Sequence, residues 1–444
     1  MNLIGKQNIF TPKSLVQLQE LITNGQALVL TGAKTSTVLP FDRLEDVSCL
    51  DLSCLPKEAK IIDSHLVVTG PVTWAEARAL AQSQNFDLMA MPTEESAYVL
   101  SGIATSATGE LSFGFGAIRD HVVWLEYMNS QGEISKLESS QDLKVELDEV
   151  LQEALGEYEK EYSPYSHFKN GPFPRFEKAT DLMVGTEGQL GVITKAAFKL
   201  RPKKLSDFLF INLPRWQEDY GMHLALFEYA QTRRGDIYSV ELMDEASMNY
   251  LDKSVRPFEK GDVLFMEVDQ DVLEDVYHEL SDIQNFHMDQ VLMVGHSKAM
   301  QMRLQIPRAI NERNSRLGII KKGTDAQVRR DKISLLLDTY KEMAELGIDC
   351  ILFGHFGDAH LHFNFLPTSE QVHKCDEALV SFYNKIHLLK GSPFAEHGIG
   401  LIKQKFMGPF YNEKIKRVFY LLKKKYDPAN KFFPMGYFNI KDNQ

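Results

Sequence analysis

The stretch CILFGHFGDAHLHFNF, residues 350–365, carries the pattern that most directly indicates both a local fold and a function. Its apolar start predicts a strand, and the glycines of GHFGD at 354–358 are typical of a tight turn. The alternation that follows predicts a second strand, with His360 and His362 on one face. A hairpin of the two strands would return His355 to that face, so we expect the three imidazoles to lie together.

A second pair of ionisable residues follows in the stretch EHGIG at residues 396–400. Imidazole and carboxylate groups together are the usual ligands of a divalent transition metal, so the histidines and Glu396 predict a metal site. The glycines after Glu396 and His397 indicate a loop in which one residue could bind the metal while the next acts as a base. Histidines with unrelated roles, and Gly398 as a helix cap, are the alternative interpretation.

Three further segments are rich in small residues, which allow the backbone to approach a ligand closely. They are TGAKTST at 31–37, SGIATSATGELSFGFG at 101–116 and DLMVGTEGQLGVITKAAFKL at 181–200. None contains the dinucleotide fingerprint GxGxxG at a strand–helix junction. On glycine spacing alone, these segments could equally be ordinary turns.

Patterns along the rest of the chain predict a mixed fold of more than one domain. A length of 444 residues is typical of two or three domains. The first part alternates short strands and helices, and after about residue 206 strands alternate with longer helices, which indicates an α+β second domain. Strands are expected at 65–69, 122–128, 208–212 and 263–268, and helices at 11–23, 74–83, 216–232, 273–284, 334–346 and 412–425.

Composition excludes several classes of protein. A chain that is 44% hydrophobic and 25% charged is typical of a globular protein. The net charge of -12 disfavours general nucleic-acid binding. We expect no membrane span and, because MNLIGKQ at residues 1–7 lacks the apolar stretch of a signal peptide, a cytoplasmic location. The four cysteines match no zinc or iron–sulfur spacing and are expected to be reduced thiols.

Together, these motifs resemble those of the FAD-linked oxidases of the vanillyl-alcohol oxidase type. Residues 181–203 resemble the family segment GSEGTLGIITEATLKLxP, residues 354–362 resemble GHxGDGNxH, and residues 393–400 resemble the EHGIG motif. Weaker matches are RDHV at 119–122, ELMD at 241–244 and the DP that starts a tail at 427–428. The resemblance covers nearly the whole chain, and its subgroup is that of the D-lactate, glycolate and D-2-hydroxyglutarate dehydrogenases.

The resemblance implies an α+β fold with a two-part FAD-binding domain and an α+β cap domain. The FAD-binding domain would span residues 1–205, the cap 206–395, and a C-terminal segment, 396–444, would return to the FAD-binding domain. FAD would be held without a covalent bond, since no His or Cys is placed for one. The implied cofactor contacts are Gly32, Thr35 and Ser36, then Ala104, Thr105 and Gly109, then Gly185, Glu187, Gly188, Gly191, Val192 and Ile193.

The resemblance also implies a reaction, in which a D-2-hydroxy acid is oxidised to the 2-oxo acid. A divalent metal, Zn or Mn, would be held by His355, His362 and Glu396 and would polarise the substrate. His397 would act as the base while hydride passes to flavin N5, and Arg303 would bind the substrate carboxylate, with Lys321 or Lys322 as a second contact. The expected partners are a small 2-hydroxy acid and an electron acceptor that the sequence does not name; a homodimer is one assembly open to the chain.

The sequence departs from the family pattern at several positions. Ala33 and Lys34 stand where the first loop usually has glycine, the segment at 100–109 has lost glycines, and His360 replaces an Asn of the metal motif. Three other functions stay open. The chain could act like the alkyl-dihydroxyacetonephosphate synthases, which use FAD without net oxidation and also have a His-rich active site. It could be a metal-dependent hydrolase in which Glu396 or His397 activates water, since His and Glu ligands by themselves permit that chemistry. The altered glycines also leave open a flavin-free remnant of the fold.

Overall fold

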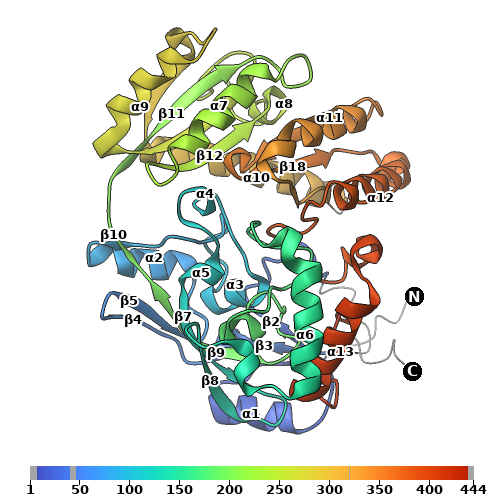
Figure 1. Ribbon diagram of the computed structural model, residues 1–444. Helices are drawn as coiled ribbons and strands as arrows, with labels where there is room; N and C mark the ends of the chain where they lie inside the picture. The colour runs from blue at the N-terminus through green and yellow to red at the C-terminus, as the bar shows by residue number, and fades with distance from the viewer. Residues whose placement is uncertain (1–7, 41–46, 320, 439–444) are drawn as a thin grey trace. The chain divides into compact units, whose positions relative to one another are not determined.

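The computed structural model describes residues 8–40, 47–319 and 321–438 (Figure 1). The chain forms two compact units. The first unit comprises residues 1–108, 117–203 and 396–444, and the second comprises 109–116 and 204–395. Both units combine helices with sheets, which confirms the predicted α+β class. Residues 1–7, on which the expected absence of a signal peptide depended, lie outside the described part.

A small parallel sheet and a larger antiparallel sheet form the centre of the first unit. The parallel sheet has the order β1 (Ile9–Phe10), β3 (Ser48–Asp51) and β2 (Leu28–Thr31). The antiparallel sheet has the order β4 (Glu58–Ile62), β5 (His65–Thr69), β9 (Val192–Lys199), β7 (Val122–Met128) and β8 (Ile134–Glu138). The strands predicted at 65–69 and 122–128 are therefore confirmed.

Helices of the first unit begin where side chains cap them. In α2 (Trp74–Ser83), Thr73 accepts the backbone N–H of Glu76 at 3.1 Å, and Glu76 accepts that of Thr73 at 3.0 Å. This reciprocal pair is a capping box, which fixes the start of the helix at the predicted residue. Helix α1 (Leu15–Thr23) begins later than the predicted residue 11, because Ser14 is its N-cap.

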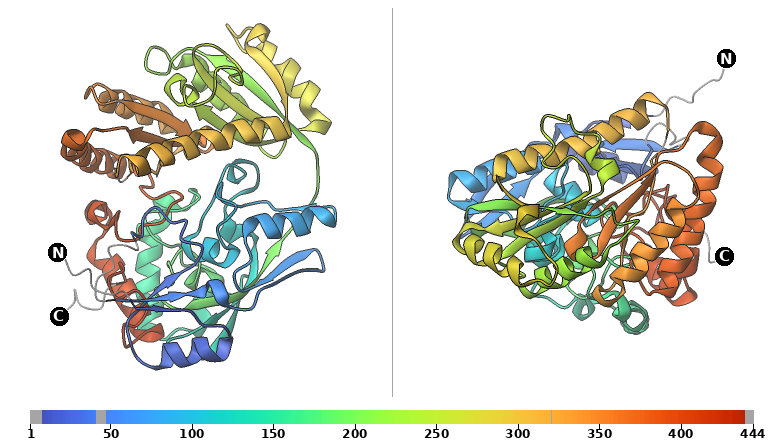
Figure 2. Two further views of the ribbon diagram at one scale, coloured as in Figure 1. Left: turned by 180° about the vertical axis from the view of Figure 1, so that it is seen from behind. Right: turned by 90° about the horizontal axis from the view of Figure 1, so that it is seen from above.

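Two long helices of the first unit lie side by side and carry opposite charges (Figures 1 and 2). Helix α6 (Glu149–Tyr162) is acidic and α13 (Glu413–Tyr426) is basic. Lys414 lies 2.8 Å from Glu161, and Arg417 lies 3.3 Å from Glu153. Because water screens their charges, these exposed ion pairs contribute little to stability; their main effect is on how the two helices align.

The second unit is built on a sheet of eight strands. The order is β14 (Val291–Gly295), β11 (Ser206–Leu213), β13 (Asp262–Asp269), β12 (Ile237–Met243), β17 (Cys350–Gly354), β18 (His360–Phe365) and β15 (Lys322–Gly323), and β16 (Ala326–Gln327) also pairs with β18. Its principal helices are α7 (Gly221–Thr232), α9 (Leu273–Glu279), α10 (His296–Arg316), α11 (Ile333–Ala344) and α12 (Val372–Leu388).

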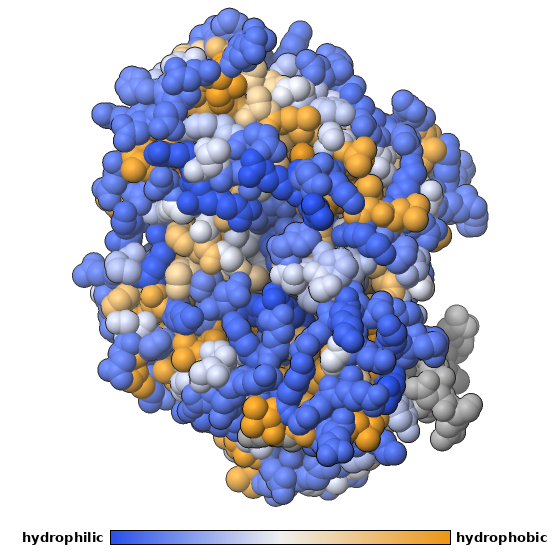
Figure 3. Space-filling model, viewed as in Figure 1, coloured by the Kyte–Doolittle hydropathy of each residue, from blue (hydrophilic) through white to orange (hydrophobic). Residues whose placement is uncertain are grey.

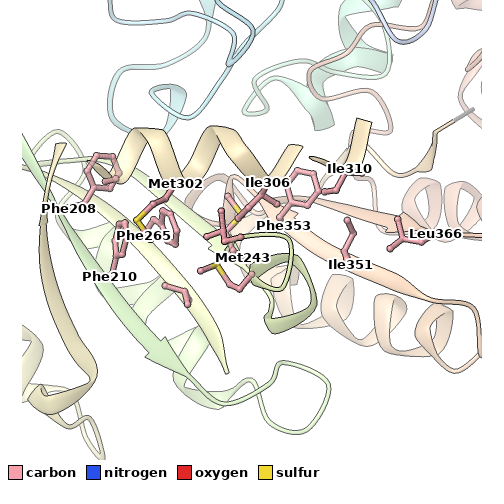
Figure 4. Close-up of a cluster of buried hydrophobic side chains, with 14 residues drawn as sticks. Phe208, Phe210, Met243, Phe265, Met302, Ile306, Ile310, Ile351, Phe353 and Leu366 are labelled. Atoms are coloured by element: carbon pink, nitrogen blue, oxygen red, sulfur yellow. The ribbon is translucent and has the colours of Figure 1, made fainter. Parts of the chain in front are cut away.

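Helix α10 covers one face of this sheet with an apolar stripe (Figure 4). Met302, Ile306 and Ile310 of the helix form one buried cluster with Phe208, Phe265 and other residues of the strands. Burial of such side chains is the main favourable term that holds the helix in place.

The hairpin predicted within residues 350–365 is present. Strands β17 and β18 pair antiparallel, with Phe353 opposite His362. Ala359 takes a left-handed conformation, with φ of +52°, at the end of the turn between them. The hairpin therefore places its histidines as the alternation predicted.

The surface of the described residues gives no sign of a membrane-spanning helix. Within residues 8–40, 47–319 and 321–438, the helices are too short or too polar to cross a bilayer. On the face drawn in Figure 3, apolar residues form small separate groups among polar ones.

Candidate active site

Three histidines of the β17–β18 hairpin lie together in the second unit. His360 and His362 project from β18, and His355 lies at the start of the preceding turn. The ring centroids are 5.2 Å apart for His355 and His360, and 4.6 Å apart for His360 and His362. All three side chains are buried, so each imidazole needs a polar partner in the protein.

Each of these histidines has one ring nitrogen facing an acceptor of the same unit. His362 Nδ1 lies 3.2 Å from the carbonyl oxygen of Thr324, and His360 Nε2 lies 3.0 Å from Asp325 Oδ1. His355 Nδ1 lies 2.6 Å from Glu241 Oε1. A carbonyl or carboxylate oxygen only accepts a hydrogen bond, so in each ring the facing nitrogen carries the proton. The other nitrogen of each ring then offers a lone pair, which is the arrangement found in metal-binding histidines.

The three histidines by themselves form a group of potential metal ligands in the second unit. One donor atom from each of His355, His360 and His362 lies within 4.8 Å of the others. Three imidazole nitrogens fit a divalent transition metal, to which a carboxylate is a common further ligand. Glu396, the predicted carboxylate ligand, belongs to the first unit, and its role as a ligand stays a prediction.

The structure therefore brings together two of the predicted ligands, His355 and His362, and adds His360 to them. The resemblance had placed His360 where the family has Asn, outside the ligand set. In the same part of the second unit, a carboxylate oxygen of Asp325 and a ring nitrogen of His362 lie within 4.8 Å of each other. His397 belongs to the first unit, and its role as the base stays a prediction.

Arg303 lies on α10 and is buried between two carboxylates. Its Nη1 lies 2.9 Å from Glu110 Oε1, and its Nη2 lies 3.3 Å from Glu241 Oε2. Burial opposes the charge of Arg303, but the two carboxylates outweigh this cost and raise the pKa of the guanidinium. Glu241 is also the partner of His355, so a chain of polar contacts runs from Glu110 to the β17–β18 hairpin. From the sequence, no site role was predicted for Glu110, Glu241 or Asp325, although two of the segments quoted there contain Glu110 and Glu241.

Lys322, considered as a second substrate contact, also has a protein partner. Its Nζ donates to both carboxylate oxygens of Asp376 at 2.7 Å. A substrate carboxylate would have to compete with this ion pair.

The three predicted flavin segments converge in the first unit. The N–H of Gly185 donates to the carbonyl oxygen of Ile103 at 3.1 Å, and that of Glu187 donates to Ala104 at 2.7 Å. Gly32 packs so closely on Ser101 that a side chain there would overlap the serine hydroxyl. Small residues therefore let the segments at 31–37, 100–108 and 185–193 lie against one another.

The first of these segments keeps a backbone conformation that usually needs glycine. Lys34 has a φ of +59°, in the left-handed region, although it stands where the family has glycine. Its Nζ lies 2.9 Å from Asp51 Oδ2, so this lysine has a carboxylate partner within the protein. Thr35 and Ser36 are exposed in the same loop.

The remaining predicted cofactor residues occupy three settings. Gly191 packs on the ring of Tyr127 immediately before β9, whose first residues are the buried Val192 and Ile193. Thr105 ends α3 (Val99–Thr105), and Gly188 packs on Leu30 with a φ of +71°. Gly109 groups with the second unit, where its carbonyl oxygen accepts the hydroxyl of Ser112 at 2.5 Å. Their contacts to a cofactor stay predictions.

Two unsatisfied hydroxyls show that the flavin segments fit a polar ligand. Thr31 Oγ1 and Thr108 Oγ1 are buried, and neither has a hydrogen-bond partner among the described residues. Buried hydroxyls are nearly always satisfied in folded proteins. A polar cofactor held by these small-residue segments would supply such partners.

Comparison with known families identifies two domains in the chain. Residues 7–138 match the FAD binding domain, and residues 223–435 match the C-terminal domain of FAD linked oxidases. The first range contains the predicted flavin segments at 31–37 and 100–109, and the second contains the β17–β18 hairpin.

Curated relatives are similar at low identity. A putative mitochondrial D-lactate dehydrogenase of Schizosaccharomyces pombe is 27% identical over 58% of this chain and 52% of its own length. The glycolate oxidase subunit GlcD of Bacillus subtilis is 24% identical over 71% and 63%, and a D-2-hydroxyglutarate dehydrogenase of Xanthomonas citri is 24% identical over 69% and 61%. The matched part thus spans about half to two thirds of these relatives.

Among solved structures, an alkyldihydroxyacetonephosphate synthase has the same fold. The two structures superpose with a TM-score of 0.63 at 14% identity, over 95% of this chain and 75% of the synthase. At this identity the likeness describes architecture and leaves the reaction to the residues of the site.

Proposed function

The chain belongs to the FAD-linked oxidases, and on that premise we propose that it oxidises a D-2-hydroxy acid to the corresponding 2-oxo acid with FAD and a divalent metal. The observation that carries this proposal is the set of three buried imidazoles, each with one nitrogen fixed by an acceptor. Such a set prepares lone pairs for a metal. The names of the curated relatives support a hydroxy acid as the substrate.

FAD and the metal would be held by different parts of the chain. The segments at 31–37, 100–109 and 185–193 would bind FAD without a covalent bond, and His355, His360, His362 and Glu396 would bind Zn or Mn. When bound, FAD supplies a two-electron acceptor, and the metal supplies a Lewis acid that makes the substrate hydroxyl more acidic.

His397 is the residue proposed to move the proton. An imidazole nitrogen can take the proton of the substrate hydroxyl when it lies within hydrogen-bond reach of it. Its position directly after a metal ligand restricts where that nitrogen can lie.

Arg303 is proposed to contact the substrate carboxylate in addition to its two ion pairs. A guanidinium has five N–H donors in a planar fork, a geometry that suits a substrate carboxylate as well as Glu110 and Glu241. The same ion pairs mean that Arg303 also orients Glu241, and through it His355. Its substitution should therefore affect the metal site as well as the substrate.

The deciding experiment is an anaerobic titration of the purified holoprotein followed by its visible spectrum. We expect a flavin spectrum that bleaches with one of D-lactate, glycolate or D-2-hydroxyglutarate, and the L enantiomers of the chiral acids are the matched controls. A flavin spectrum that no hydroxy acid changes would contradict the oxidation and favour a reaction without net redox, as in the synthase of similar fold. Failure to bind added FAD would contradict the flavoenzyme itself.

A further inference from the structure

The loop that carries Glu396 and His397 is held by a buried carboxylate of the first unit. Glu187 Oε1 accepts the backbone N–H of Ile399 at 2.5 Å, and Oε2 accepts that of Gly400 at 3.0 Å. A carboxylate that binds two successive N–H groups fixes the path of the backbone between them.

Glycine is required on the loop side of this contact. Gly398 has a φ of +74°, and a Cβ atom there would lie 2.6 Å from Glu187 Oε1. Gly400 has a φ of +53°, and a side chain there would overlap the carbonyl oxygen of Val38. That same carbonyl accepts the N–H of Leu401 at 3.0 Å. The loop is therefore anchored at two neighbouring points.

The backbone of Glu187 is fixed as well. Its φ of +54° is in the left-handed region, and its N–H donates to Ala104 at 2.7 Å. Glu187 thus joins the second predicted flavin segment, the third one and the 396–400 loop. Its carboxylate, however, faces the loop.

We propose that Glu187 is a positioning residue, which holds the 396–400 loop and so fixes His397 and Glu396 relative to the flavin segments. The cofactor contact expected of Glu187 stays a prediction beside this second role. We call the two hydrogen bonds from Ile399 and Gly400 to Glu187 the clamp. The effect of the clamp on catalysis depends on the proposed function, whereas the clamp itself does not.

Substitution by Gln tests the clamp with little change in size. The amide of Gln has one acceptor oxygen, and its NH₂ group would face the second backbone N–H, so one of the two hydrogen bonds is lost. Asp181→Asn is the control, because Asp181 Oδ2 also accepts two backbone N–H groups, those of Glu177 at 3.0 Å and Lys178 at 2.9 Å. Asp181 also forms a buried ion pair with Arg119 at 2.6 Å, so this variant additionally shows what a general loss of stability does to exchange at Ile399 and Gly400. Asp181 is in the same unit but clamps another loop.

Hydrogen–deuterium exchange of the purified holoprotein is the primary measurement. In Glu187→Gln, at least one of the amides of Ile399 and Gly400 should exchange about tenfold faster, since one of the two hydrogen bonds to this side chain is lost. In Asp181→Asn, these two amides should keep their wild-type rates. Gly398→Ala, which presses on the same carboxylate from the loop side, should reproduce the effect of Glu187→Gln and serves as the second variant if Glu187→Gln does not fold.

Kinetics then separate positioning from stability. Once the titration has identified a substrate, kcat per bound flavin should fall at least about tenfold in Glu187→Gln, while KM and flavin content stay near wild type. A purely structural role would lower only the yield of folded holoprotein. Loss of flavin with unchanged exchange at Ile399 and Gly400 would overturn the proposal. Because exchange needs no substrate, failure to find one would leave this result intact.

Discussion

His355 Nδ1 lies 2.6 Å from Oε1 of Glu241, and both side chains are buried. The contact fixes which nitrogen of His355 is left for a metal. We predict that Glu241→Gln weakens metal binding about 10- to 100-fold, as loss of such partners typically does. Metal content after dialysis against a chelator checks this. Glu267→Gln, on the neighbouring strand β13, is the control, and equal metal loss in both variants would show that Glu241 has no special role.

The resemblance implied His355, His362 and Glu396 as metal ligands, and the structure adds His360 to the candidates. We expect His360→Ala to lower the bound metal as strongly as His355→Ala, because both rings offer a nitrogen to the same group. Atomic absorption of the purified variants measures this. His373→Ala removes an exposed histidine of α12 and should keep the full metal content. Wild-type metal content in His360→Ala would restrict the ligands to His355, His362 and Glu396.

His397→Asn should abolish reduction by the hydroxy acid and leave FAD bound, since only the proton acceptor is lost. The visible spectrum reports both properties in one sample: the flavin bands should remain and should no longer bleach. Reduction at the wild-type rate would remove His397 from the role of base.

Arg303→Met should destabilise the fold by about 3–5 kcal/mol, because it breaks buried ion pairs with Glu110 and Glu241. Urea unfolding of the variants measures the free energy. Adding Glu110→Gln removes one of the two buried charges, and the double variant should recover part of the loss. If instead the two substitutions add, Glu110 and Arg303 are not coupled.

The raised pKa of Asp244 should make the free energy of unfolding depend on pH. Burial, with help from the charge of Asp262, raises the pKa of Asp244 from 3.8 to about 7. The folded protein thus retains a proton that the unfolded chain releases, so stability falls as pH rises from about 4 to about 7. Asp244→Asn keeps an acceptor for the N–H of Ser247 and should remove roughly 4 kcal/mol of this fall. Urea midpoints measured between pH 4.5 and 7.5 that run parallel for the two proteins would contradict this.

The elements that were predicted accurately are those that local chemistry determines. Helix α2 begins at its capping box, and β18 (His360–Phe365) follows from strict alternation. Helix α7 was predicted from residue 216 and begins at Gly221. Trp216 is buried, and its backbone N–H donates to the carboxylate of Asp262 on a distant strand. This tertiary contact overrides the helical pattern of the sequence.

The histidine cluster could be predicted, but its hydrogen-bond partners could not. Glu241 is 114 positions from His355 in the chain, and Asp325 is 35 from His360, so no spacing rule connects them. One signal was present in the sequence: Glu241 is an acidic residue inside the otherwise mostly apolar strand β12. A buried carboxylate needs a cationic or hydrogen-bonding partner, which would have made it a candidate.

The confinement of three ligands to one β-hairpin has a consequence for the order of folding. Strands joined by a short turn close at a small cost in chain entropy, whereas Glu241 and Asp325 must arrive from far along the chain. The nitrogen donors should therefore gather early, as a loose chelator. Their acceptors would select the metal-binding tautomers only when the whole sheet is complete. Metal affinity, followed during refolding, would then report the last step of assembly of the second unit.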